Sequence, residues 1–154
     1  MKVSRKTDYA LRALMTLVGR YGQGPVSTRE LAEVNDIPRR FLEQIMLELK
    51  SIQFVRSVAG RIGGFELAKP PEEITMGQIV RHFDGIIAPI SCVSASSYEP
   101  CSQETTCRFR RIMLDIRNFS LQMLDEASLS AVYNVSPVDE SEVFDLEFIG
   151  GDGI

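Results

Sequence analysis

Three cysteine residues lie close together in the second half of the chain, at Cys92, Cys101 and Cys107. Eight and five residues separate them, which differs from the C-x2-C spacing of zinc ribbons. An odd number of thiols cannot pair completely in intramolecular disulfides, and clustered thiols in a reducing compartment more often serve metal or redox chemistry. The spacing alone leaves three interpretations open: an iron–sulfur cluster, a thiol redox switch, or cysteines without a special role.

The surroundings of these cysteines are compatible with a bulky inorganic group. The residues between them, such as 94–97 and 102–106, are small or polar and can wrap closely around a cluster. Cys107 is predicted to open a long helix, where the positive end of the helix dipole favours a thiolate.

Acid–base and nucleophilic catalysis have little support in this sequence. His82 is the only histidine, which argues against a histidine-centred hydrolase and against a two-histidine metal site. Neither a nucleophile–base pair nor a phosphate-binding loop is visible. We therefore predict that the protein is not an enzyme.

The composition is that of a folded globular protein with an uneven charge distribution. Of the 154 residues, 44% are apolar and 25% charged. No apolar run approaches the ~18 residues of a membrane-spanning helix, and the start lacks the apolar stretch of a signal peptide, so we expect a soluble, cytoplasmic protein without a membrane partner. Although the net charge is −4, residues 1–69 hold 12 basic and 7 acidic side chains, whereas residues 133–154 hold six acidic and no basic ones. The basic first half is compatible with DNA binding.

The first half predicts three helices followed by a β-hairpin. Apolar residues three and four positions apart predict a helix over residues 5–20. Ser27 and Glu30 have the spacing of a reciprocal capping box, which opens a short helix ending at Asn35, a C-cap that tolerates the left-handed conformation. Pro38 pre-sets the first turn of a third helix that runs to about residue 51. We expect its inward face to comprise Phe41, Leu42, Ile45, Met46 and Leu49.

Alternating residues over 54–58 and 65–68, around a glycine-rich tip, predict the hairpin. Helix, capped helix, third helix and hairpin in this order predict a winged helix-turn-helix DNA-binding domain over residues 1–70. The fold class is therefore mainly α-helical with a small β-hairpin wing.

The second half predicts a cysteine loop and a long helix. A capping box at Thr75 opens a short helix within residues 71–106, and the cysteine loop follows it. Residues 107–132 contain a helix from about 107 to 131, roughly 36 Å long, which we interpret as a dimerisation helix. Its apolar positions recur at spacings of four and three: Ile112, Ile116, Phe119, Met123 and Ala127. Residues 133–154 predict an acidic, partly disordered tail.

In such a domain the third helix would lie in the major groove of double-stranded DNA, and the wing tip could enter the minor groove. Arginine can bind guanine or phosphate, glutamine can pair with adenine, and glutamate can accept a hydrogen bond from cytosine. The candidate DNA-binding residues are Ser27, Thr28, Arg39, Arg40, Glu43, Gln44, Lys50 and Arg61.

Four separated motifs occur in an order that resembles the IscR/NsrR/RirA/CymR-type winged-helix repressors. They are TDYALRAL at residues 7–14, FLEQ at 41–44, the wing GRIGGFELA at 60–68, and three cysteines before a long helix. The resemblance covers roughly residues 1–132. It implies a homodimeric transcription regulator that binds a two-fold symmetric operator, and, as in the iron–sulfur members, a 2Fe–2S or 4Fe–4S cluster in the cysteine loop.

The resemblance also implies a set of cluster ligands. Cys92, Cys101 and Cys107 match the three thiolate positions. IscR-like members use a histidine three residues after the last cysteine, and this chain has Arg110 there. NsrR-like members take a carboxylate from the first helix of the partner subunit, and Asp8 matches that position. His82 is an alternative ligand just before the loop.

We therefore predict a regulator, expected to be a repressor, that senses iron, redox state or nitric oxide through an iron–sulfur cluster. One alternative is a cluster-free, CymR-like regulator of sulfur metabolism that responds to thiol oxidation or to a partner protein. A different class of alternative is a small iron–sulfur redox protein or electron carrier.

Overall fold

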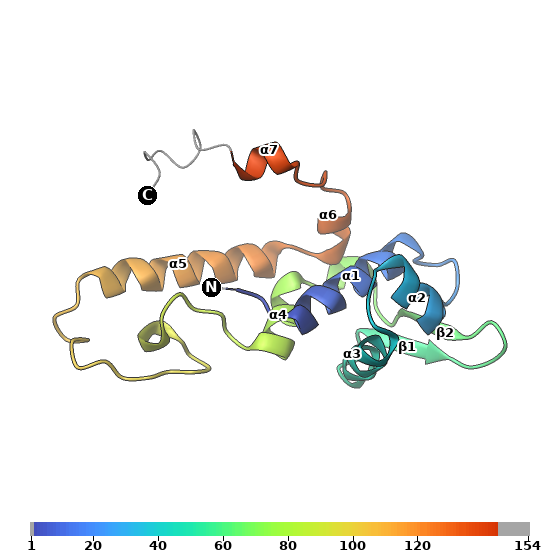
Figure 1. Cartoon of the computed structure of the whole chain (residues 1–154), viewed down its shortest axis with the longest axis horizontal. Coiled ribbons are helices and arrows are strands. Elements are labelled where there is room, and N and C mark those ends of the chain that lie inside the picture. Colours follow the sequence, from blue (N-terminus) through green and yellow to red (C-terminus); the bar gives the residue numbers. More distant parts are fainter. Residues whose placement is uncertain (1, 145–154) are drawn as a thin grey trace.

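The computed structural model describes residues 2–144 and has two parts, a compact head and an extended arm (Figure 1). The head comprises α1 (Arg5–Gly19), α2 (Thr28–Val34), α3 (Arg39–Ser51) and the strands β1 (Val55–Val58) and β2 (Gly64–Leu67). A 3-10 turn, η1 (Pro71–Glu73), leads to α4 (Met76–Asp84), from which the chain enters the arm.

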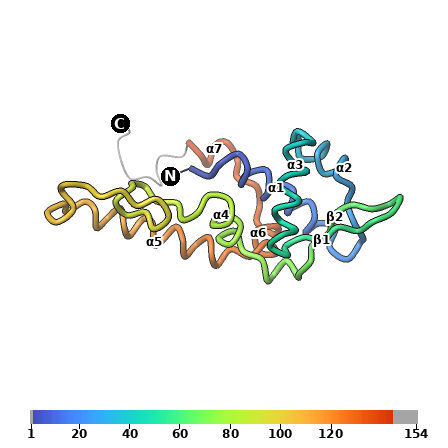
Figure 2. The backbone as a smooth tube through the Cα atoms, turned by 90° about the horizontal axis from the view of Figure 1, so that it is seen from below, coloured from blue at the N-terminus to red at the C-terminus, as the bar shows by residue number. Residues whose placement is uncertain are grey.

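The arm consists of the cysteine loop and the helix that follows it. The loop contains the 3-10 turn η2 (Ser91–Val93) and turns back to join α5 (Phe109–Glu126). Loop and helix run beside each other in both views of the backbone (Figure 2). Two short helices follow, α6 (Leu129–Tyr133) against the head and α7 (Glu140–Val143).

One hydrophobic core holds the head together. From α1 it takes Ala10, Ala13, Leu14 and Leu17, and from α3 it takes Leu42, Ile45, Met46 and Leu49, all buried as the helical spacing predicts. Phe41 was predicted to face inward as well, and this is wrong: it is 52% exposed. Phe41 lies beside the buried stripe of α3 and packs edge-on against Tyr9, with ring centroids 6.2 Å apart.

The hairpin is an antiparallel wing, as predicted. Val55 pairs with Leu67 and Val58 with Gly64, which leaves residues 59–63 as the tip. Phe65 also exchanges two backbone hydrogen bonds of 2.8 Å with Val26, so the wing is attached to the segment before α2. The fold class, mainly helical with a two-stranded wing, is confirmed.

The helix caps follow the predictions in part. Thr75 forms the complete reciprocal capping box of α4. The Ser27 hydroxyl accepts from the Glu30 amide as predicted, but the Glu30 carboxylate binds Arg20 at 2.8 Å, and no return bond to Ser27 forms. Asn35 is the C-cap of α2, yet the left-handed residue is the next one, Asp36, with φ of 51°. Pro38 is the N-cap of α3 and precedes its first turn.

The predicted single helix from 107 to 131 begins only at Phe109, so Cys107 precedes the helix instead of opening it, and the helix is interrupted before 131. α5 ends at Glu126, and the Ser128 hydroxyl caps α6 by accepting from the Ala131 amide. The break lets the backbone pair with the segment between η1 and α4, through the amide of Leu129 and the carbonyl of Ile74 at 2.8 Å. Leu129 thereby enters the core of the head, where it is fully buried.

Burying Leu129 favours the break over helix continuity, because a leucine buried in this way contributes about 2 kcal/mol. Ala127, predicted on the apolar stripe, lies outside the helix. The predicted tail starts as α6 ends, and its residues 145–154 lie outside the described part of the chain. Among residues 2–144, no helix has both the length and the apolar character needed to cross a membrane.

Candidate DNA-binding surface and cysteine cavity

The outer face of α3 carries most of the predicted DNA-binding side chains. Arg39, Arg40 and Gln44 are exposed there, and Glu43 is half-buried. The Nε of Arg39 donates to the Glu43 Oε1 at 2.9 Å, so the two charges largely neutralise each other. Arg40 forms no ion pair within residues 2–144, which leaves a net positive charge near the N-terminal end of the helix.

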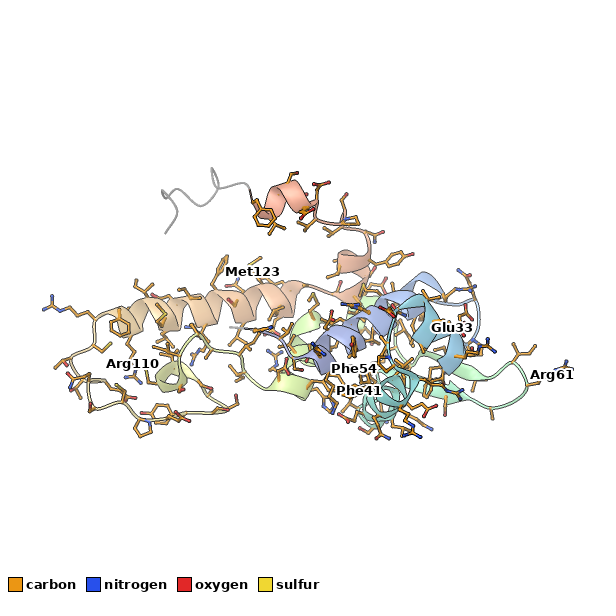
Figure 3. All side chains as sticks on the ribbon, in the orientation of Figure 1. Glu33, Phe41, Phe54, Arg61, Arg110 and Met123 are labelled. Atoms are coloured by element: carbon orange, nitrogen blue, oxygen red, sulfur yellow. The ribbon has the colours of Figure 1, made fainter. Side chains whose placement is uncertain are left out.

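The other candidate DNA-binding residues lie around this helix, and some of them are already engaged in hydrogen bonds within the head. Lys50 donates to the Ser57 hydroxyl at 2.7 Å and ties α3 to the wing. Ser27 uses its hydroxyl to cap α2, and Thr28 begins that helix. Arg61 projects from the wing tip, beyond the rest of the molecule (Figure 3). Within residues 2–144 neither Arg40 nor Arg61 forms an ion pair, and they lie on α3 and on the wing tip of one head.

All three cysteines line a single cavity in the arm, with a volume of about 620 Å³. Its walls also include the apolar side chains of Ile90 and Phe109 and the cationic Arg108 and Arg110. The three thiols are free; Cys92 and Cys107 are half-buried and Cys101 is exposed. A thiol-lined, partly apolar cavity with cations at its wall suits a group of negative charge.

Within the described residues, no three Cys, His, Asp or Glu side chains are grouped closely enough to hold a metal ion. A cluster has several iron atoms that share the protein ligands among them, so these ligands do not have to meet at one point. The shared cavity with separated thiols therefore fits an iron–sulfur cluster better than a lone zinc ion, whose four ligands must meet at one point.

Arginine side chains from α5 fasten the cysteine loop. Arg110 donates to the Cys92 carbonyl from Nη2 at 2.8 Å and from Nε at 3.2 Å, and Arg117 donates to the Val93 carbonyl. Figure 3 shows Arg110 between α5 and the loop. Arg110 also lies 3.4 Å from a carboxylate oxygen of Glu104. These roles escape sequence reasoning, because a basic residue on a helix carries no signal for the carbonyl that it meets.

Neither predicted fourth ligand lines this cavity in the single chain. Asp8 lies half-exposed on α1 and forms a two-point ion pair with Arg12, at 2.7 and 3.0 Å. His82 stacks edge-on against Phe83, and its Nε2 lies 4.0 Å from the Glu48 carboxylate. A contribution of Asp8 would therefore have to come from a second subunit.

The end of α4 connects the cysteine loop to the head. One carboxylate oxygen of Asp84 accepts the Ser4 amide at 2.9 Å and the Thr7 hydroxyl at 2.8 Å, so it holds the start of α1. Partial burial raises the pKa of Asp84, but these hydrogen bonds outweigh it and lower the pKa below its ordinary value. Next to it, Lys6 binds Glu48 of α3 at 2.7 Å.

α5 presents a continuous apolar stripe to solvent. Phe109, Ile112, Ile116, Phe119 and Met123 are between 41% and 64% exposed, and α5 has no buried residue at all. Met123 lies on the side of α5 away from Arg110 and the loop (Figure 3). A contiguous stripe of this kind on a helix is typical of a protein–protein interface.

Comparison with known proteins gives one consistent family. The model of the Rrf2 family, described as an iron-dependent transcriptional regulator, matches residues 3–135. An rrf2-like HTH-type transcriptional regulator of Rhodobacter capsulatus is 35% identical over 133 residues, covering 82% of this chain and 89% of the relative. The HTH-type transcriptional regulator CymR of Bacillus subtilis is 32% identical over 75% of this chain and 83% of its own length.

Solved structures agree with the sequence matches. The structure of CymR, the global cysteine regulator of B. subtilis, superposes with a TM-score of 0.72 at 28% identity, covering 89% of this chain and 99% of CymR. IscR from T. potens superposes with a TM-score of 0.68 at 26% identity, covering 90% and 94% of the two chains.

Proposed function

Because the chain belongs to the Rrf2 family of HTH transcriptional regulators, we propose that it represses transcription by binding a two-fold symmetric operator as a homodimer whose affinity depends on an iron–sulfur cluster. Members of this family are named as DNA-binding regulators and not as enzymes. Membership favours a regulator over the small redox protein considered from the sequence.

The DNA-binding part of the proposal is supported by the charges of the head. The face of α3 offers Arg40, which has no ion pair in the described part of the chain, with Gln44 and the Arg39–Glu43 pair beside it. Arg61 extends the positive surface to the wing tip. Charges placed in this way bind phosphates and base edges, and binding through several phosphate contacts weakens steeply as the salt concentration rises.

The sensing part depends on the shared cavity. Cys92, Cys101 and Cys107 are the residues that would hold the cluster, with Asp8 of the partner subunit as the proposed fourth ligand. When bound, the cluster supplies a group that oxidants, nitric oxide or iron shortage can alter. The cation Arg108 at the cavity wall would balance part of the negative charge of the bound cluster and its ligands.

The chain's own contacts supply a route from this cavity to the DNA. Asp84 lies at the root of the cysteine loop and holds the N-terminus of α1, while Lys6 of α1 holds Glu48 of the recognition helix. A ligand from α1 of the partner subunit would in addition link the cysteine loop of one subunit to the head of the other. The cluster would favour the dimer arrangement in which this link is made. Loss of the cluster would remove that preference and so change the spacing of the two recognition helices.

The observation that carries this proposal is the presence of all three thiols on one cavity. Its test is anaerobic purification followed by visible absorption and iron and sulfide analysis, for the parent and for Cys101→Ser. We expect a coloured parent with iron and sulfide, and a variant that has lost most of both. An iron-free, colourless parent would contradict the sensing part alone.

A second candidate function has its own support. CymR, named as a global cysteine regulator, matches this chain in sequence and structure. A cluster-free regulator of sulfur metabolism, controlled by thiol oxidation or a partner protein, is therefore the alternative. It predicts metal-free protein whose operator affinity changes on mild oxidation and recovers on reduction, with Cys101→Ser insensitive to both.

A further inference from the structure

The cysteine loop is fastened by a network that does not involve the thiols themselves. Glu104 is its centre: one carboxylate oxygen accepts the Cys101 amide at 3.1 Å, and both oxygens accept the Tyr98 hydroxyl, at 3.0 and 2.8 Å. Arg110 pairs with the same carboxylate at 3.4 Å and binds the Cys92 carbonyl through two N–H groups. The network therefore joins the backbone of two of the three cysteines.

The charges in the network are mutually satisfied. The hydrogen bond from Tyr98 lowers the pKa of Glu104, and the Cys101 amide and the Arg110 charge lower it further, so the carboxylate stays ionised at neutral pH. Its side chain is only 17% exposed and that of Arg110 is 32% exposed. Hydrogen bonds to ionised groups are stronger than neutral ones, so this network is a strong polar anchor of the loop.

The network attaches the cysteine loop to the helix α5. Apart from η2, the described loop has no regular structure, and its carbonyls need partners from elsewhere. Arg110 lies in the first turn of α5, three residues after Cys107. Cys107 is held separately, through a 2.8 Å hydrogen bond from its amide to the Gln103 carbonyl. Cys92 and Cys101 are thus connected to the first turn of α5 through Arg110 and Glu104, and Cys107 lies two residues before that helix.

We infer that Arg110 and Glu104 are positioning residues that keep the three cysteines on one cavity before any group is bound. In this chain, position 110 acts on the Cys92 backbone instead of supplying a ligand. A guanidinium can place two parallel donors on one carbonyl and a third beside a carboxylate, which an ammonium group cannot do. The inference rests on the proposed function only in taking the cavity as the sensing site.

The test measures alkylation rates of each cysteine by mass spectrometry, in reduced, metal-free, full-length protein. In Arg110→Ala we expect half-buried Cys92 to react about five-fold faster than in the parent, the effect of losing one net hydrogen bond. The Cys101 amide, which Glu104 holds, should exchange with deuterium faster by a similar factor. Arg111→Ala is the matched control, because it removes the neighbouring guanidinium, which binds Asp115 at 3.3 Å on the same helix.

Two further variants separate geometry from charge. Arg110→Lys keeps the charge without the paired donors, so its rates should stay close to those of Arg110→Ala. Glu104→Ala should accelerate the same sites, and the double variant should be no faster than the faster single one, because both residues act in one network. The melting temperature should change little, since neither residue belongs to the hydrophobic core.

Unchanged rates in Arg110→Ala, full rescue by lysine, or additive effects in the double variant would each overturn the inference. Because these measurements use metal-free protein, an iron-free parent would contradict the sensing proposal and leave this result in place. Conversely, a coloured parent together with unchanged alkylation rates in Arg110→Ala would overturn the positioning role alone.

Discussion

Neighbouring residues of α3, the proposed recognition helix, differ in the charge that they can offer to DNA. Arg39 forms an ion pair with Glu43 on the same helix, whereas Arg40 is exposed and forms no ion pair in the described part of the chain. Exposed i,i+4 pairs contribute only about 0.3–0.5 kcal/mol, so Arg39 can be released when a phosphate or base competes for it. Arg40 is available from the start.

Arg40→Ala should weaken operator binding about ten-fold and reduce the salt dependence of binding by roughly one phosphate contact. Fluorescence anisotropy with a labelled operator at several salt concentrations measures both quantities. Arg111→Ala on α5 removes the same charge far from the head and should leave affinity unchanged. Equal effects of the two substitutions would show that only overall charge matters.

Asp8 is expected to act on a bound cluster and very little on folding. Its pair with Arg12 is exposed, so Asp8→Ala should leave the dimer folded, with a melting temperature close to that of the parent. The cluster of the variant should bleach several-fold faster in air, as followed by visible absorption. Glu33→Ala, which breaks another exposed i,i+4 pair, is the control. A spectrum and lifetime identical to those of the parent would exclude Asp8 as a ligand.

At the scale of elements, the junction of α1 and α4 has a polar centre. Thr7 is fully buried, and its hydroxyl reaches Asp84 across 77 positions of sequence. The hydrogen bonds lower the pKa of Asp84 in the folded protein, so its carboxylate stabilises the fold at any pH above its ordinary value of about 3.9. This stabilisation is lost as the pH falls below that value and through the lower pKa of the folded state.

Asp84→Asn should therefore be less stable than the parent at pH 7, with the difference shrinking below about pH 4. Urea unfolding between pH 3 and pH 7 measures this difference. Asp115→Asn, an exposed carboxylate on α5, serves as the control and should show no such pH dependence. A difference for Asp84→Asn that is the same at every pH would mean that its charge has no role.

Elements with a local signal could be predicted from the sequence, and those set by long-range contacts could not. The caps at Ser27 and Thr75 and the buried stripe of α3 follow from residue types and helical spacing. The end of α5 does not, because it depends on Leu129 entering a core built from the other end of the chain. Ser128 was the available signal, as a serine in N-cap position before a short helix.

The candidate site shows the same division. The three cysteines were predicted by type and proximity in sequence, and the structure places them on one cavity. The partners that hold them there, Glu104 and Arg110, meet only because the loop turns back onto α5. The expected inward position of Phe41 failed because the period of the helix gives a direction and no limit to the width of the buried face.

At the scale of the whole molecule, a single chain leaves the arm incomplete. The loop covers one side of α5, and the stripe from Ile112 to Met123 is exposed, while Phe109 at its start also borders the cysteine cavity. Apolar side chains at spacings of three and four along an 18-residue helix form the kind of surface that packs against an equivalent helix. For Asp8 to serve as the proposed ligand, the dimer must also bring α1 of one subunit to the cysteine cavity of the other.

Ile116→Asp should convert the dimer to a monomer, because it buries an unpaired charge in the centre of that interface. Light scattering coupled to size-exclusion chromatography gives the mass directly. Asn118→Asp adds the same charge to the same helix away from the stripe, and should remain dimeric. A parent that is monomeric at tens of micromolar, or an unaffected Ile116→Asp, would exclude this interface.

The central claim is that the state of the cysteine cavity sets the affinity for the operator. The most direct test measures operator affinity of one anaerobic preparation at one salt concentration. The affinity is measured with the cluster bound, after its removal and after reconstitution. Cys107→Ser is treated in parallel. The account predicts that affinity changes at least ten-fold on removal and returns on reconstitution, while the variant does not respond. Operator affinity that is the same in all three states of the parent would contradict it.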